Sequence, residues 1–264
     1  MDSALCTLAM IGEIMYAKSG NSFKPIDSGV LVDTVPAGVY TLARTMFGFE
    51  LQKASDFEVP SKIYGRFEEK ADRIFNTFIQ RPTSTGVLLA GEAGCGKTML
   101  RRQISLKGIE RGMITILVNE AQYGDNFYSF IMSIEQPAII FFDEFEKTFD
   151  PCEQDMVLTL LDGVCTSKKL YILTCNDIKR INSHMINRPG RLYYALNFSY
   201  LDKDFIVDYC RAELIDQSQV NSVVKIATDH GSFSFDMLKA LVEEMNRYSE
   251  PASKSIQMLN IKYL

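Results

Sequence analysis

Residues 86–98 have the sequence GVLLAGEAGCGKT, which contains the most specific motif of the chain. The apolar run Gly86–Ala90 predicts a buried strand, and the run Met99–Lys107 that follows predicts a helix. Between them stands the pattern GxxxxGK[ST], in which glycines let the backbone wrap around phosphate groups beside a helix N-terminus. Strand, glycines, lysine and threonine occur in the required order, so we predict a phosphate-binding loop rather than an ordinary strand–helix turn.

The motif predicts roles for its lysine, its threonine and its backbone N–H groups. Lys97 is predicted to contact the β- and γ-phosphates of a nucleotide, and Thr98 is predicted to bind Mg²⁺. The backbone N–H groups of the loop are expected to surround the phosphates. The predicted nucleotide-binding residues of this segment are Gly91, Glu92, Ala93, Gly94, Cys95, Gly96, Lys97, Thr98 and Met99.

A second chemical signal is the sequence IIFFDE at residues 139–144. Four apolar residues predict a buried strand, and two acids follow at its carboxyl end, where open α/β sheets bind ligands. Asp143 is predicted to hold Mg²⁺ through its water shell, and Glu144 to orient and activate an attacking water. An apolar run before Asp-Glu is a common strand end by itself, but its position one strand–helix unit after the loop makes it a strong signal.

The alternation of apolar strands with amphipathic helices predicts an α/β fold, a P-loop NTPase with a doubly wound parallel sheet. We expect a small β-rich N-terminal module at 1–60, the α/β domain at 61–200, a helical lid domain at 201–250 and a C-terminal tail at 251–264. The remaining predicted strands are Thr115–Asn119 and Leu170–Thr174, with β-prone runs at Gly29–Asp33, Gly38–Ala43 and Phe47–Gln52. The predicted helices are Arg66–Gln80, Lys203–Ile215, Val220–Asp229 and Ser234–Tyr248.

Residues 60–248 resemble the AAA+ ATPase family, with an AAA+ core as the implied fold. Asn176, in the segment TCN at 174–176, matches the family's sensor 1 position, which implies contact with the γ-phosphate or the lytic water. The segment NRPGR at 187–191 matches an RPGR segment whose arginines reach a neighbouring subunit. The resemblance therefore implies that Arg188 and Arg191 are arginine fingers, that ATP and Mg²⁺ are the cofactors, and that Lys97, Glu144 and Asn176 take part in catalysis.

Further residues indicate a branch of the family. The segments LLDG at 160–163 and RPGR resemble the AAA clade proper, as does the lack of an arginine within GSFSF at 231–235, where other branches place a sensor 2 arginine. The short connection between residues 123 and 143 is similar to the branch of the mitochondrial Rieske-protein translocase. The compact size resembles small phage-encoded ATPases. Tyr64 and Gly65 resemble the segment whose backbone contacts adenine.

Tyr123 and Gly124 follow the predicted second strand, where AAA unfoldases carry an aromatic–apolar–glycine pore loop. The order here is Gln122-Tyr123-Gly124, so the aromatic residue stands one place from the usual position. A pore-loop residue and a half-exposed turn residue are equally compatible with this pattern.

Composition narrows the classes of function. A net charge of −5 and a pI near 5.2 argue against a general polyanion-binding surface, although a local basic patch is compatible with them. Basic residues on or after the loop helix are expected on a solvated face or a subunit contact rather than a nucleic-acid stripe: Arg101, Arg102, Lys107 and Arg111.

The six cysteines, in no CxxC pair, predict free thiols rather than zinc ligands. The apolar stretch 4–17 is too short for a membrane span, so we expect a cytoplasmic protein, in the host cytoplasm if the chain is phage-encoded.

These features together predict a Mg²⁺-dependent ATPase that forms a homo-oligomeric ring, expected as a hexamer, and remodels a protein partner. Two alternatives stay open. One is a nucleic-acid-associated, loader-like ATPase, against which the acidic balance counts. The other is an assembly scaffold that binds ATP without hydrolysing it, against which the complete set Lys97, Asp143, Glu144 and Asn176 counts.

Overall fold

The computed structural model describes residues 15–19, 22–26, 32–45, 48–58, 62, 64–119, 125–162, 167–186, 188–198, 201–231 and 233–261. The chain divides into two compact units, residues 1–35 and 36–264. The first unit contains an antiparallel pair of strands, β1 (Met15–Ser19) and β2 (Ser22–Ile26). The second unit contains every residue of the predicted nucleotide site.

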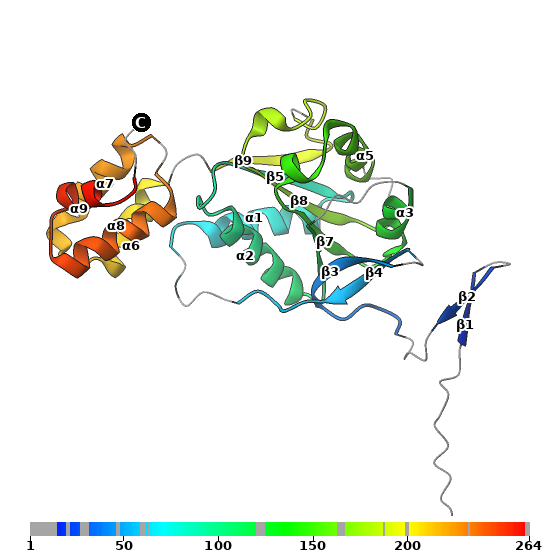
Figure 1. Ribbon diagram of the computed structural model, residues 1–264. Helices are drawn as coiled ribbons and strands as arrows, with labels where there is room; N and C mark the ends of the chain where they lie inside the picture. Colours follow the sequence, from blue (N-terminus) through cyan, green and yellow to red (C-terminus); the bar gives the residue numbers. More distant parts are fainter. Residues whose placement is uncertain are drawn as a thin grey trace, which may run out of the picture. The chain divides into compact units, whose positions relative to one another are not determined.

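A seven-stranded sheet forms the centre of the second unit, with the strand order β4-β3-β6-β7-β8-β5-β9 (Figure 1). All neighbouring strands are parallel except β3 and β4, which pair antiparallel. The strands are β3 (Gly38–Thr45), β4 (Gly48–Lys53), β5 (Thr85–Ala90), β6 (Ile114–Val118), β7 (Ala138–Phe142), β8 (Lys169–Cys175) and β9 (Leu192–Asn197). The order places β8 between β5 and β7, so the three strand ends that carry the predicted site are consecutive.

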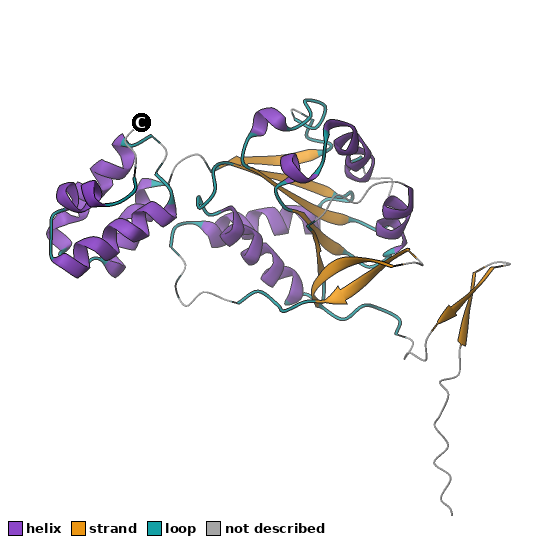
Figure 2. Cartoon of the chain, in the orientation of Figure 1, coloured by secondary structure: helices purple, strands orange, loops and turns teal. Residues whose placement is uncertain are grey.

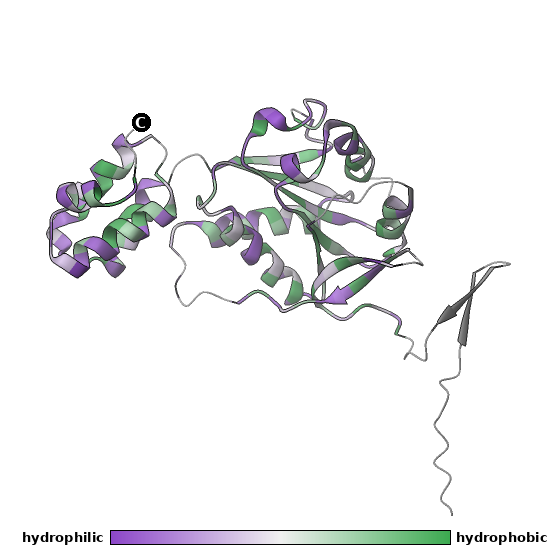
Figure 3. Ribbon diagram, viewed as in Figure 1, coloured by the Kyte–Doolittle hydropathy of each residue, from purple (hydrophilic) through white to green (hydrophobic). Residues whose placement is uncertain are grey.

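Helices cover both faces of the sheet, which explains why the central strands are apolar without alternation (Figures 2 and 3). Val87 and Leu89 of β5 belong to the same apolar core as α1 (Phe67–Gln80) and α2 (Lys97–Ile109). On the other face, the ring of Phe142 in β7 contacts Phe127 of α3 (Asp125–Ser133) and Phe145 of α4 (Phe145–Thr148). Helix α5 (Pro151–Leu161) begins with a capping box formed by Asp150 and Glu153.

The C-terminal part of the second unit is helical. It consists of α6 (Lys203–Glu213), α7 (Val220–Asp229), α8 (Phe235–Tyr248) and α9 (Ala252–Met258). Short 3₁₀ helices occur at Ile178–Arg180 and Gln217–Gln219. The helical part joins the core of the α/β part, because the ring of Phe205 in α6 lies 6.1 Å from the ring of Phe67 in α1. This contact brings the helical part beside the predicted nucleotide site.

The structure differs from the predicted domain boundaries at both ends. The β-prone runs at Gly38–Ala43 and Phe47–Gln52 do form strands, but β3 and β4 extend the main sheet through pairing of β3 with β6, so a module ending at residue 60 does not describe them. The first unit ends at Val35 instead. Of the predicted run Gly29–Asp33, the described residues 32 and 33 are not in a strand. The predicted tail contains α9, whose Ala252 and Ile256 are buried in the core, so apolar burial adds it to the helical part.

No helix within the described ranges is long and apolar enough to cross a lipid bilayer.

Candidate functional site

The segment between β5 and α2 folds as a tight loop because of its glycines. Gly91, Gly94 and Gly96 all have positive φ, at 142°, 75° and 98°. A Cβ at Gly91 would lie 2.6 Å from the carbonyl oxygen of Phe198, and one at Gly96 would lie 2.5 Å from the ring of Phe67. The loop therefore needs glycine for its conformation and for space, as a phosphate-binding loop does.

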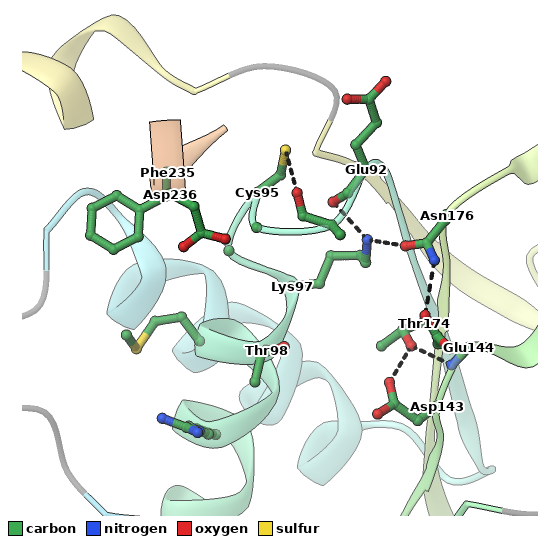
Figure 4. A pocket seen from close by; sticks show the side chains of 15 residues that line it. Glu92, Cys95, Lys97, Thr98, Asp143, Glu144, Thr174, Asn176, Phe235 and Asp236 are labelled. Atoms are coloured by element: carbon green, nitrogen blue, oxygen red, sulfur yellow. Dashed lines mark hydrogen bonds between the residues drawn. The ribbon is translucent and has the colours of Figure 1, made fainter. Parts of the chain in front are cut away.

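This loop borders a cavity of about 470 Å³ into which the predicted polar residues converge (Figure 4). The predicted residues that line it are Glu92, Ala93, Gly94, Cys95, Gly96, Lys97, Thr98, Met99, Asp143, Glu144 and Asn176. They come from the loop after β5, from the start of α2 and from the segments directly after β7 and β8. A cavity at the carboxyl edge of a parallel sheet, beside a helix N-terminus, is suited to an anionic ligand.

The Lys97 ammonium lies against three oxygen acceptors. Nζ donates to the carbonyl of Gly91, to the carbonyl of Glu92 at 2.9 Å and to Oδ1 of Asn176 at 2.9 Å. Burial lowers the pKa of Lys97, while the surrounding acidic groups oppose that shift. Since an ammonium group has three donors, a phosphate could bind Lys97 only by taking over at least one of these contacts.

Both oxygens of the Asp143 carboxylate have partners. Oδ1 accepts a hydrogen bond from Oγ1 of Thr174 at 2.7 Å, and Oδ2 lies 2.8 Å from the Arg101 guanidinium. Burial would raise the pKa of Asp143, but the Thr174 hydrogen bond and the Arg101 charge outweigh it and hold the pKa below its usual value. The carboxylate is therefore ionised at neutral pH, and both of its oxygens already have partners within the chain.

Glu144 is held in an unusual backbone conformation at the edge of the cavity. Its φ is 43°, in the left-handed region, and its N–H donates to Oγ1 of Thr174 at 2.9 Å. Its Oε1 accepts from Lys147 Nζ at 2.6 Å and from Asn176 Nδ2 at 3.1 Å. These two hydrogen bonds lower the pKa of Glu144, so it is a carboxylate at neutral pH. Backbone strain of this kind is typical of functional sites.

Asn176 connects the two halves of the site. It follows the last residue of β8, and its amide accepts from Lys97 with one atom and donates to Glu144 with the other. Figure 4 shows this chain of contacts from the loop lysine to the acid after β7. The structure thus brings Lys97, Asp143, Glu144 and Asn176 together, as the sequence predicts.

A smaller apolar cavity of about 220 Å³ adjoins the first. The two cavities share Cys95, Gly96, Met99 and Phe235 in their walls. Tyr64 lines the smaller cavity, whose other aromatic residues are Phe67, Phe205 and Phe235. Gly65 has a φ of 74°, and a Cβ there would lie 2.8 Å from the ring of Phe205. The predicted adenine-contacting segment therefore lies beside an aromatic pocket next to the phosphate loop.

Several residues of the site were missing from the sequence prediction. Thr174 holds Asp143 and the N–H of Glu144, although the sequence shows it only as a strand residue before Cys175 and Asn176. Phe235 and Asp236 of α8 line the large cavity, and the N–H of Phe235 donates to the carbonyl of Gly94 at 3.0 Å. No local pattern signals these contacts, because they join elements far apart in the sequence.

The predicted arginine fingers lie outside the cavity. Neither Arg188 nor Arg191 is among the described residues that line it. Arg191 forms a two-point contact with Asp162, with Nε 2.5 Å from Oδ1 and NH2 2.7 Å from Oδ2, and it also donates to the carbonyl of His184. Arg188 is exposed. The hydrogen bond and the charge of Arg191 lower the pKa of Asp162.

The basic residues expected on a solvated face or a subunit contact have different surroundings: Arg101 and Lys107 of α2 pair with acids of the same chain, Arg102 lines the large cavity, and Arg111, after the helix, is exposed. Arg101 is 12% exposed and paired with Asp143, and Lys107 is 16% exposed and paired with Asp72 of α1. Arg111 lies 4.8 Å from the ring of Phe75. The acidic and aromatic residues that contact these side chains come from other elements, so the sequence of α2 alone did not reveal them.

The predicted pore-loop residues Tyr123 and Gly124 lie outside the described residues.

Part of the chain matches a known protein family. Residues 87–200 match the model of the family described as "ATPase family associated with various cellular activities (AAA)". Residues 87–200 therefore form a domain of the AAA ATPase family. The matched range of this AAA domain runs from β5 through β9 and includes the loop, both acids, Asn176 and both arginines.

Known relatives agree with the family assignment. The chain is 32% identical to "Nuclear valosin-containing protein-like" of Mus musculus over 130 residues, or 42% of this chain and 15% of that protein. It is 26% identical to "Peroxisomal ATPase PEX1" of Dictyostelium discoideum over 179 residues, or 60% of this chain and 14% of that protein. It is 25% identical to "AAA ATPase forming ring-shaped complexes" of Corynebacterium diphtheriae over 179 residues, or 55% of this chain and 35% of that protein. The matches therefore span a minor part of each relative.

The family assignment confirms three predictions. They are the AAA+ resemblance, the α/β P-loop fold with a largely parallel sheet, and the enzyme class, an ATPase. Nucleotide binding follows from the domain.

Proposed function

We propose that the AAA domain binds ATP with Mg²⁺ and hydrolyses it at the interface between subunits of a homo-oligomeric ring, expected as a hexamer, to remodel a protein partner. One observation carries the proposal. A loop lysine, the two acids after β7 and the asparagine after β8 line one cavity, and Asn176 hydrogen-bonds directly to Lys97 and to Glu144. Phosphoryl transfer needs positioning and charge stabilisation above all, and these are the properties of the cavity.

The two adjoining cavities have the polarity that ATP requires. The loop N–H groups and Lys97 would hold the phosphates on the polar side, and the aromatic pocket beside Tyr64 would hold the base. Glu144 is exposed and ionised, so it can accept a proton from a water molecule placed in the cavity. Asn176 would then orient the same water or a phosphate oxygen, since it already contacts Glu144.

The residues present fit a magnesium ion. Mg²⁺ prefers oxygen ligands, keeps several waters and is held by one or two protein groups together with substrate phosphates. The Thr98 hydroxyl and the Asp143 carboxylate both line the phosphate cavity. Thr98 would bind the ion, and Asp143, whose oxygens are engaged by Thr174 and Arg101, would hold its water shell. The ion would supply charge neutralisation at the phosphates.

The arginines support a site shared between subunits. Arg188 is exposed and, like Arg191, is not among the described residues lining its own chain's cavity. An arginine that stabilises charge in phosphoryl transfer can come from another subunit. One relative is named for forming ring-shaped complexes, which supports a ring for this chain.

The sharpest test of the proposed chemistry is Glu144→Gln with Glu135→Gln as a matched control. Glu135 is an exposed glutamate before the other end of β7. Glu144→Gln should bind a fluorescent ATP analogue with wild-type affinity but release phosphate on the order of 10²-fold or more slowly, since the amide cannot take a proton. Glu135→Gln should match wild type in both assays. Phosphate release by Glu144→Gln at the wild-type rate would refute Glu144 as the base.

The same variant tests the protein partner. Glu144→Gln with ATP should retain a protein that Lys97→Ala, which cannot bind ATP, does not retain, and purified wild-type protein should then alter that partner's structure only with ATP and Mg²⁺. Stimulation of the ATPase by DNA or RNA, with no retained protein, would favour the nucleic-acid alternative. Nucleotide binding without phosphate release by wild type would favour the scaffold.

A further inference from the structure

Glu146 is a buried acid that has no role in the ATP hydrolysis proposed above. Its side chain is only 5% exposed, and Oε2 is buried with no hydrogen-bond partner among the described residues. Burying a carboxylate with an unsatisfied oxygen costs free energy, so an acid at this position calls for a role.

The other oxygen of Glu146 binds the backbone of Asn176. Oε1 accepts the Asn176 N–H at 2.9 Å. The last residue of β8 paired with β5 is Cys175, opposite Ala90, so Asn176 lies just beyond the ladder. Glu146 thus supplies an acceptor that the sheet does not provide.

Two hydrogen bonds connect the end of β8 to the turn after β7. The N–H of Glu144 donates to Oγ1 of Thr174, and the N–H of Asn176 donates to Oε1 of Glu146. The left-handed residue Glu144 stands at the start of α4, so Glu146 falls in the first turn of that helix. One turn of chain therefore presents an acid to the cavity and anchors the asparagine that contacts this acid.

We propose that Glu146 is a positioning residue for ATP hydrolysis, holding the Asn176 backbone so that the Asn176 side chain bridges Lys97 and Glu144. The inference deepens the proposed function and rests on it. What Glu146 contributes is a hydrogen-bond acceptor at a set distance, so glutamine, which has the same length and keeps one oxygen, can replace it. Methionine fills a similar volume but leaves the Asn176 N–H without an acceptor.

The experiment compares Glu146→Met with Glu146→Gln, and uses Glu135→Met as the control for the substitution itself. Glu146→Met should lower kcat by at least about tenfold, as expected for loss of a charge-assisted hydrogen bond, while the Kd of a fluorescent ATP analogue changes less than about twofold. Glu146→Gln should recover most of kcat, and Glu135→Met should behave as wild type. If Glu146→Met does not fold, Glu146→Ala takes its place.

Two further readouts separate positioning from general stability. Adding Glu146→Met to Asn176→Ala should cause no further loss of kcat, because both changes remove the same interaction. Hydrogen exchange at the Asn176 amide should be faster in Glu146→Met than in Glu146→Gln without nucleotide, which requires no catalysis. Full activity of Glu146→Met, additive losses in the double variant, or unchanged exchange would overturn the inference. Failure of wild type to bind ATP would instead overturn the proposed function.

Discussion

Around Lys97, side chains that follow consecutive strands of the sheet line one cavity. The two arginines of the segment 188–191 do not line it. Arg191 is bound to Asp162 of its own chain and Arg188 is exposed. The difference shows which part of the proposed chemistry one subunit can build. Binding groups, acids, Arg102 and the bridging asparagine line the cavity of a single chain, and we propose that a second copy supplies the arginine finger.

The largest effect is expected at Lys97, inside the cavity of a single subunit. Lys97→Ala removes the only described lysine that lines the large cavity and the donor to Asn176. Binding of ATP, measured by anisotropy of a fluorescent analogue, should fall below detection, and phosphate release should stop with it. Wild-type binding by Lys97→Ala would contradict the phosphate-loop assignment.

The next largest effect is expected at Arg188, which is exposed. Arg188→Ala should lower phosphate release by about 10³-fold or more, because arginine fingers contribute on the order of 10³–10⁵ in rate. The affinity of the isolated subunit for ATP should stay at the wild-type value, since Arg188 does not line its own cavity. A parallel loss of affinity would show instead that Arg188 acts within its own subunit.

Arg191→Ala sharpens the distinction between the two arginines. We expect it to lower phosphate release as Arg188→Ala does, but also to destabilise the fold, because it leaves Asp162 and the carbonyl of His184 without their donor. Urea unfolding of both variants measures this. Equal stability of Arg188→Ala and Arg191→Ala would mean that the Asp162 contact contributes nothing in solution.

The smallest effect is the pH dependence of that contact. Arg191 lowers the pKa of folded Asp162, so the pair stabilises the protein above the unfolded pKa of about 3.9, and this stability is lost as pH falls through the folded value. Because the Asp162 side chain is 43% exposed, we expect no more than about 1 kcal/mol. Urea unfolding of wild type and Asp162→Asn should differ at pH 7, and the difference should shrink as pH falls below the unfolded pKa and through the folded pKa of Asp162. A gap that does not shrink as pH falls would assign the effect to packing.

The same contrast explains what the sequence could and could not predict. The loop glycines, Lys97 and the acids after β7 follow local patterns, so their identity and their meeting at one sheet edge were predictable. The contacts of Thr174, Arg101 and Glu146 join separate elements and depend on strand order and on one left-handed residue. The pairing of β3 with β6, which adds residues before 60 to the sheet, is likewise a long-range event without a local signal.

The measurement that tests the shared site most directly mixes two inactive variants. Arg188→Ala subunits keep the phosphate loop, and Lys97→Ala subunits keep the arginine. Mixed rings, verified by co-purification of differently tagged subunits, should contain interfaces in which an intact loop faces an intact arginine. We predict that phosphate release reappears on mixing, in proportion to such interfaces, while each variant alone stays inactive. Mixed rings that form and remain inactive would contradict a site built by two subunits.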